Sequence, residues 1–146
     1  NPGFLLAVML WAPFKYHLLA YREDELKDMH KVKLIMDQVI DEQMVVLKIP
    51  RRFIGMIQDI WFLQYKMLQM RPRVIYHVSH QRYFRAAIDF LEFRVEAGEP
   101  LDELAQWWRA YCDADDEQRK LLVKRKCKRS TPSRRGRKKP SVERKN

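Results

Sequence analysis

Apolar side chains recur at intervals of three and four residues along most of this 146-residue chain. The clearest example lies in residues 23–47, where Leu26, Met29, Val32, Met36, Val39, Ile40, Met44 and Leu47 follow this spacing. Such positions share one face of a helix, because an α-helix has about 3.6 residues per turn. Charged residues occupy the opposite face. The pattern predicts a long amphipathic helix over residues 23–47.

Proline, glycine and capping residues divide the rest of the chain into further helical segments. Pro13 is expected to end or kink the first helix, Ser79 to cap the start of another, and Gly98 to follow the end of that one. Asp115 or Asp116 can cap a short last helix. The predicted ranges are 3–11, 51–70, 73–78, 80–97 and 100–112. Hairpin turn pairs are almost missing, so we expect an all-α fold, a compact bundle of about six or seven helices.

The net charge of +10 comes almost entirely from one end of the chain. Residues 124–146 hold 12 Lys/Arg and one acid, about +11, whereas residues 1–123 hold 17 basic and 18 acidic residues, about −1. The basic segment has almost no apolar residue, so it cannot offset the entropy cost of ordering. We therefore expect one helical domain over residues 1–123 and a disordered basic tail over residues 124–146, of a kind that binds polyanions.

The apolar opening, NPGFLLAVMLWAPF, is too short to cross a membrane. Fourteen helical residues span about 21 Å, against about 30 Å of hydrocarbon. The segment also lacks a basic start and a cleavage site, so it does not resemble a signal peptide. Because the chain begins without Met and directly in apolar sequence, we expect it to be a piece of a larger protein. No membrane partner is expected.

Catalytic and metal-binding motifs do not stand out in the sequence. There is no Gly-rich phosphate loop, no Ser/His/Asp or Cys/His signature, and no Gly/Ser turn beside the carboxylate pairs. His77 and His80 are close together, but no further ligand has metal spacing. Cys112 and Cys127 are too few for a disulfide framework, which favours a reduced, cytoplasmic protein. We predict no catalytic residue, no metal site and no cofactor in this chain.

Arginines gather at the ends of the middle helices and are candidates for phosphate contact. If those helix ends meet in space, Arg51, Arg52, Arg71, Arg73, Arg82 and Arg85 would form one basic strip. The alternative is that they pair with nearby carboxylates, as Arg85 could pair with Asp89 one helical turn away. From this group we select Arg51, Arg52, Arg71 and Arg73 as RNA-binding candidates.

Aromatic side chains are candidates for base stacking, but helical spacing among aliphatic residues favours a place in the core. This applies to Trp61, Tyr83 and Phe84. Of the adjacent Trp107 and Trp108, only one can face fully inward, so the other is the better candidate for a partly exposed platform.

The basic tail supplies the remaining RNA-binding candidates. They are Lys124, Arg125, Lys126, Lys128 and Arg129 in its first run, and Arg134, Arg135, Arg137, Lys138 and Lys139 in its second. A dense mixture of Lys and Arg without acidic partners favours non-specific phosphate binding through counterion release. The alternative is a tail that solubilises the protein or binds partner proteins.

Several stretches together resemble the C-terminal part of bacterial poly(A) polymerase. They are IPRRFIGMIQDIWFLQYKM (residues 49–67), HQRYFRAAIDFLEFRVE (80–96), LDELAQWWRAY (101–111) and the opening NPGFLLAVMLWAPF. The element from Arg85 to Arg94 fits R-A-A-x-D-x-L-x-x-R, and QDIW at 58–61 is similar to an RDIW element. A terminal tail rich in Arg and Pro, here SRRGRKKP, is also a feature of that family.

The resemblance implies an enzyme that adds AMP from ATP to RNA 3′ ends with Mg²⁺, in RNA processing and decay. Its active site lies in an N-terminal nucleotidyltransferase head that this chain lacks, so no catalytic residue can be carried over, and ATP and Mg²⁺ belong to that head. The implied partners are single-stranded RNA 3′ ends and RNA-decay proteins. Two alternatives stay open: a protein-interaction module of an RNA-decay assembly, and a free-standing basic helical nucleic-acid-binding protein.

Overall fold

A computed structural model describes residues 1–129 and shows seven α-helices in that range. Two 3₁₀ turns, η1 (Glu25–Lys27) and η2 (Arg51–Phe53), precede α2 and α3. The helices are α1 (Pro2–Leu18), α2 (Met29–Leu47), α3 (Ile54–Met67), α4 (Pro72–Ser79), α5 (Phe84–Glu96), α6 (Asp102–Asp113) and α7 (Asp116–Arg129). No strand occurs within residues 1–129, so the all-α prediction is confirmed.

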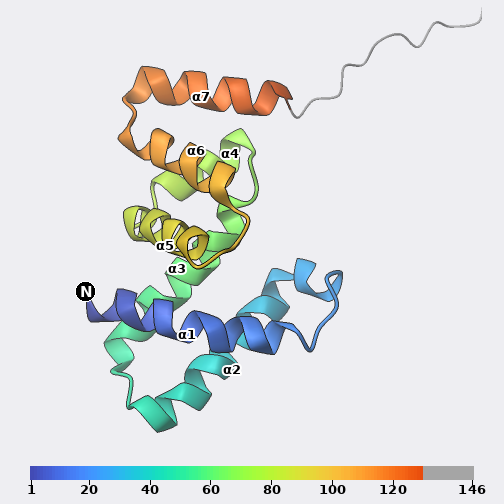
Figure 1. Cartoon of the computed structure of the whole chain (residues 1–146), viewed down its shortest axis with the longest axis vertical. Helices are drawn as coiled ribbons and strands as arrows, with labels where there is room; N and C mark the ends of the chain where they lie inside the picture. Colours follow the sequence, from blue (N-terminus) through green and yellow to red (C-terminus); the bar gives the residue numbers. More distant parts are fainter. Residues whose placement is uncertain (130–146) are drawn as a thin grey trace, which may run out of the picture.

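The helices are arranged along the long axis of the molecule (Figure 1). They pack around two apolar cores. The first core lies between α1, α2 and the start of α3, and at its centre Phe14 stacks on Trp61 with ring centroids 4.8 Å apart. The second lies between the end of α3 and helices α4, α5 and α6. Helices α3 and α5 contribute side chains to both cores, so they connect the two halves.

Helix α1 continues through Pro13, where the sequence predicted an end or a kink after Trp11. Proline removes one backbone hydrogen bond, but the residues beyond it bury apolar surface. Phe14 is fully buried, and Leu18 packs against the first core. This burial offsets the missing bond and keeps the helix intact to Leu18.

The predicted helix over residues 23–47 is wrong in its first turns. Asp28 has an extended backbone, and its Oδ1 accepts a hydrogen bond from the His30 N–H at 3.0 Å, which caps α2. The helix therefore begins at Met29. An aspartate is favoured at such an N-cap because its side chain satisfies a backbone N–H that has no partner within the helix. The preceding residues form only the short η1 turn.

Of the two caps predicted for α5, the one at its end is confirmed and the one at its start is wrong. Ser79 is the last residue of α4, where its Oγ donates to the Tyr76 carbonyl at 2.7 Å, so it does not cap α5. Helix α5 begins at Phe84. Gly98, with φ of +100°, follows the end of α5 and donates its N–H to the Val95 carbonyl, as predicted.

Helix α7 extends further than the sequence predicted, through Arg129 instead of ending near Lys124. Asp115 and Gln118 form a reciprocal capping box at its start, at 2.8 and 3.3 Å. Leu122 and Val123 pack against the second core. Lys and Arg are good helix formers, and positive charge is favourable near a helix C-terminus. The predicted disorder of residues 130–146 lies outside the described residues.

The adjacent tryptophans of α6 have different environments, as predicted. Trp108 is fully buried, and its Nε1 donates to the Met67 carbonyl at 3.0 Å. Trp107 is half-buried and stacks on Tyr111 with centroids 5.3 Å apart. Trp61 and Phe84 are also buried, which confirms their place in the core.

A polar cluster joins α1, α3 and α5 beside the first core. The Arg94 guanidinium binds both carboxylate oxygens of Glu99, at 3.2 and 2.7 Å, and donates to the Gln64 Oε1 at 3.2 Å. Glu99 also accepts from Trp11 Nε1 at 3.2 Å and lies 3.2 Å from Lys15 Nζ. Only 19% of the Glu99 side chain is exposed. We call Arg94, Glu99, Trp11, Gln64 and Lys15 the clasp.

No helix within the described part of the chain is long and apolar enough to cross a membrane.

The clasp predicts a loss of stability in acid. Burial raises the pKa of Glu99, but hydrogen bonds from Arg94, Trp11 and Lys15 outweigh it and lower the pKa from 4.5 to about 2. A carboxyl whose pKa is lower in the folded state stabilises fully above its unfolded pKa and progressively less as pH falls towards the folded value. We expect stability to fall between about pH 4.5 and 2.

The variant Glu99→Gln should flatten this pH dependence and lower the free energy of unfolding at neutral pH by about 3 kcal/mol, because each unit by which folding lowers the pKa corresponds to about 1.4 kcal/mol. Urea unfolding followed by circular dichroism at several pH values measures both effects. Glu96→Gln, at an exposed residue of α5, is the matched control and should change neither. A Glu99→Gln profile parallel to that of the unmodified chain would contradict the prediction.

The different burial of Trp107 and Trp108 predicts that the same substitution at the two positions lowers the free energy of unfolding by very different amounts. Trp108→Ala should lower the free energy of unfolding by about 3–5 kcal/mol, because it opens a cavity and leaves the Met67 carbonyl without its donor. Trp107→Ala should cost on the order of 1 kcal/mol, because that side chain already lies partly in water. Thermal or urea unfolding compares them, and equal losses would be inconsistent with the assigned packing.

Candidate nucleic-acid interface

The arginines selected from the sequence are exposed but do not form one strip. Arg51 and Arg52 lie in η2 before α3, and Arg71 and Arg73 lie at the start of α4, after α3. The 14 residues of α3 separate the two pairs by about 21 Å along the helix axis. These helix ends therefore do not meet, so the condition for one basic strip is not fulfilled. All four side chains are without an ion pair in the described part of the chain, so their charge is available to an anion.

The alternative interpretation was that Arg85 pairs with Asp89. The structure does not show this pair. Asp89 Oδ1 instead lies 2.7 Å from Arg109, which also binds both Glu92 oxygens at 2.7 and 2.6 Å. The hydrogen bonds from Arg109 lower the pKa of Glu92. Arg109 therefore connects α5 to α6, and Arg85 stays exposed on α5 without a carboxylate partner in residues 1–129.

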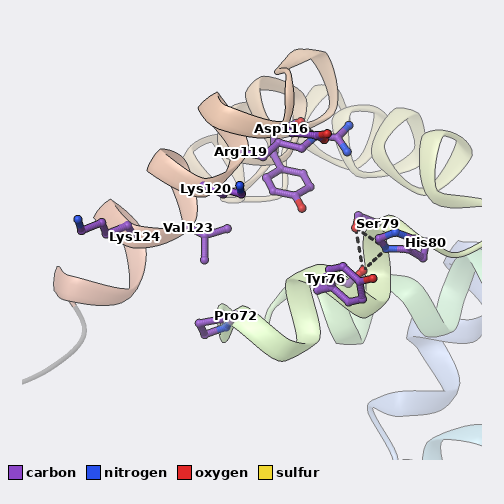
Figure 2. Close-up of a pocket in the computed structure, with 10 residues that line it drawn as sticks. Pro72, Tyr76, Ser79, His80, Asp116, Arg119, Lys120, Val123 and Lys124 are labelled. Carbon is purple, nitrogen blue, oxygen red and sulfur yellow. Dashed lines mark hydrogen bonds between the residues drawn. The ribbon is translucent and has the colours of Figure 1, made fainter.

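A groove of about 600 Å³ lies between α4 and α7 (Figure 2). The helices run in opposite directions, because Asp116 and Arg119 at the start of α7 lie at the same end of the groove as Ser79 and His80. At the other end Pro72 lies opposite Lys124. The groove thus opens beside Arg71 and Arg73, the residues that flank Pro72 in the chain.

The α7 side of the groove carries most of its positive charge. Arg119 is held in place by hydrogen bonds to the Tyr111 and Cys112 carbonyls at 2.9 and 3.1 Å, and its guanidinium lies 4.8 Å from the Tyr111 ring centre. Lys120 approaches Glu117 at 3.6 Å, but both side chains are largely exposed, so the pair contributes little. Lys124 has no ion pair among the described residues. The lysines can therefore bind phosphate without first breaking a strong contact.

The α4 side of the groove carries two aromatic rings. Tyr76 and His80 are four residues apart and lie on one face of the chain as α4 ends, with ring centroids 4.3 Å apart. Ser79 Oγ donates to the Tyr76 carbonyl, and His80 Nδ1 lies 2.8 Å from the same oxygen. The Tyr76 side chain is 66% exposed. This combination of rings and cations is typical of single-stranded nucleic-acid sites.

The sequence identified three cations of this region, Arg71, Arg73 and Lys124. It did not identify Arg119 or Lys120 of the groove lining, nor the ring of Tyr76, and His80 was considered only as a metal ligand. The available signal was the period of α4, because Ile75 and Val78 face the core and leave Tyr76 on the outer face.

The tail candidates are divided by the end of the described chain. Lys124, Arg125, Lys126, Lys128 and Arg129 are residues of α7. The second run, Arg134, Arg135, Arg137, Lys138 and Lys139, lies outside the described residues.

Comparisons with known proteins agree with this reading of the sequence. The family model described as Polymerase A arginine-rich C-terminus matches residues 24–144. Poly(A) polymerase I of Haemophilus influenzae is 34% identical over 126 residues, which are 84% of this chain and 28% of that protein. The Salmonella typhi and Escherichia coli O157:H7 proteins of the same name are 36% and 32% identical over 84% of this chain and 27% of their own length.

The chain thus spans just over a quarter of the length of these relatives, and the family model covers most of the chain. The resemblance seen in the sequence motifs is therefore confirmed: the chain belongs to the family of the arginine-rich C-terminal region of poly(A) polymerase.

Proposed function

We propose that this chain is the RNA-holding C-terminal region of an enzyme that adds AMP from ATP to RNA 3′ ends. The similar proteins are poly(A) polymerases, and the chain corresponds to just over a quarter of their length. In this proposal the transfer of adenylate, with ATP and Mg²⁺, belongs to the remainder of the enzyme. The helical region keeps the RNA strand close to that remainder.

The observation that carries the proposal is the excess of basic residues in α7 and in the sequence that follows it. Helix α7 holds seven basic residues and two acidic ones, and both acids lie in its first turn. Positive charge therefore increases along α7 towards residues 130–146, which add seven basic residues and one acid. The rest of the chain is close to neutral, so a polyanion is attracted to this side.

Binding through phosphates suits the proposed role for a physical reason. A cation bound to a phosphate releases counterions whatever the neighbouring base is, so affinity does not depend on sequence. An enzyme that extends many different RNA 3′ ends needs such tolerance. Arg71, Arg73 and Lys124 lie at the groove entrance nearest the end of α7, where a strand held by the basic tail would enter.

A protein-interaction module is the second candidate, because α1 carries an exposed apolar stripe. Leu5, Met9, Tyr16 and Leu19 are each more than half exposed and recur at helical spacing. Such a stripe is typical of a surface that another protein covers. Absence of RNA binding by the purified chain at low salt would favour this candidate.

The proposal predicts a steep salt dependence that depends on the basic tail. If about six phosphates are engaged, log Kd against log salt for single-stranded RNA should have a slope of magnitude about 4, since each contact contributes about 0.7. Truncation after Arg129 removes seven basic residues but leaves α1–α7, and should reduce the slope to about half. Removing residues 124–146 should flatten it further.

Fluorescence anisotropy with a labelled single-stranded RNA measures these slopes between low and moderate salt. Circular dichroism of the chain truncated after Arg129 is the control, because all seven helices are kept and the thermal midpoint should not change. Equal slopes for the full and truncated chains would contradict the role of the tail.

A further inference from the structure

We propose that Tyr76 and His80 form a stacking platform for one nucleobase of single-stranded RNA, in the groove between α4 and α7. This inference rests on the proposed RNA binding and deepens it, because it assigns a base-binding subsite to a region for which charge alone implies only phosphate contact.

The Tyr76 ring is available for a ligand. Helix α4 turns Ile75 and Val78 into the second core, which leaves Tyr76 on the groove side with most of its surface in water. Among the described residues, its only aromatic neighbour is His80. A tyrosine ring that is largely exposed and has one ring neighbour retains surface on which a base can stack.

The imidazole of His80 is held beside the Tyr76 ring before any ligand binds. The Tyr76 carbonyl receives the Ser79 hydroxyl at 2.7 Å and lies 2.8 Å from His80 Nδ1. These contacts set the imidazole beside the phenol ring, with an angle of 39° between the two planes. Because few rotations are lost on binding, the entropy cost of ordering the site is small.

The opposite wall can take the phosphate of the same nucleotide. Lys120 and Lys124 line the groove from α7, and Pro72 lies opposite Lys124. The volume of about 600 Å³ falls within the range of small-ligand sites and accommodates a nucleotide. Asp116 is the one carboxylate of the groove lining, at the His80 end. Its charge repels phosphate, so the strand should leave the platform towards Lys124, Arg71 and Arg73.

Stacking on a ring is also tolerant of sequence, because every base has a π-face. A Tyr platform therefore adds affinity for RNA without selecting a sequence, which agrees with the phosphate contacts. It distinguishes RNA from polyanions that have no base. This difference gives the inference a direct test.

The test compares Tyr76→Ala with Tyr16→Ala in the full chain. Tyr16 is 75% exposed on α1, away from the groove, so it is the matched control for losing an exposed tyrosine. The probes are a single-stranded oligoadenylate and inorganic polyphosphate of similar charge. Tyr76→Ala should weaken oligoadenylate binding about tenfold and leave polyphosphate binding unchanged. Tyr76→Phe should bind oligoadenylate nearly as well as the unmodified chain, since it keeps the ring.

A second readout reports stacking itself. A 2-aminopurine base within the oligonucleotide should lose fluorescence when the unmodified chain binds, and should lose much less with Tyr76→Ala. Normal, salt-dependent RNA binding by Tyr76→Ala, with unchanged 2-aminopurine quenching, would overturn the platform while leaving the proposed function intact. Failure of the unmodified chain to bind oligoadenylate at low salt would instead overturn the proposed function and this inference with it.

Discussion

The ion pair between Arg94 and Glu99 is the interaction on which the arrangement of the two halves depends. The Glu99 carboxylate also accepts a hydrogen bond from Trp11 in α1, and the Arg94 guanidinium also donates to Gln64 in α3. Gln64 in turn donates to the Ala87 carbonyl of α5 at 3.0 Å. A buried charge that loses its partner is strongly destabilising, so each member requires the others. The clasp therefore holds α1, α3 and α5 in one orientation.

This constraint determines where the proposed RNA site can form. Helices α3 and α5 contribute side chains to both cores, and Asp89 and Glu92 of α5 are engaged by Arg109. Helices α4 and α7 belong to one half only and face each other across a groove. Lys120 and Lys124 of α7 and the rings of Tyr76 and His80 remain exposed there. The groove therefore lies in the half of the molecule that contains the second core.

The sequence predicted the elements of this fold better than their contacts. The spacing of apolar residues and the glycine at 98 identified helices, because both signals depend only on residues that are close together in the sequence. Continuation of α1 past Pro13 could not be predicted, because it depends on the packing of Phe14 against Trp61, 47 positions away in the chain. The ion pair of Asp89 with Arg109 in place of Arg85 could not be predicted either, because it depends on how α6 packs against α5. Among the site residues, Lys124 could be selected from the charge of its segment, whereas Arg119 and Lys120 precede that basic run and were not selected. Tyr76 required knowledge of which face of α4 the second core covers. The family motif that ends at Arg94 proved to contain a structural residue of the clasp.

If the proposed function is right, RNA lies in the groove between α4 and α7 and not along the arginines before α3. Photo-crosslinking tests it most directly, with a single-stranded RNA that carries 4-thiouridine and with mass spectrometry to locate the modified peptides. RNA bound in the groove should give crosslinks within residues 71–80 and 119–129. Crosslinks confined to residues 51–53 or to α1, with none in the groove, would contradict it.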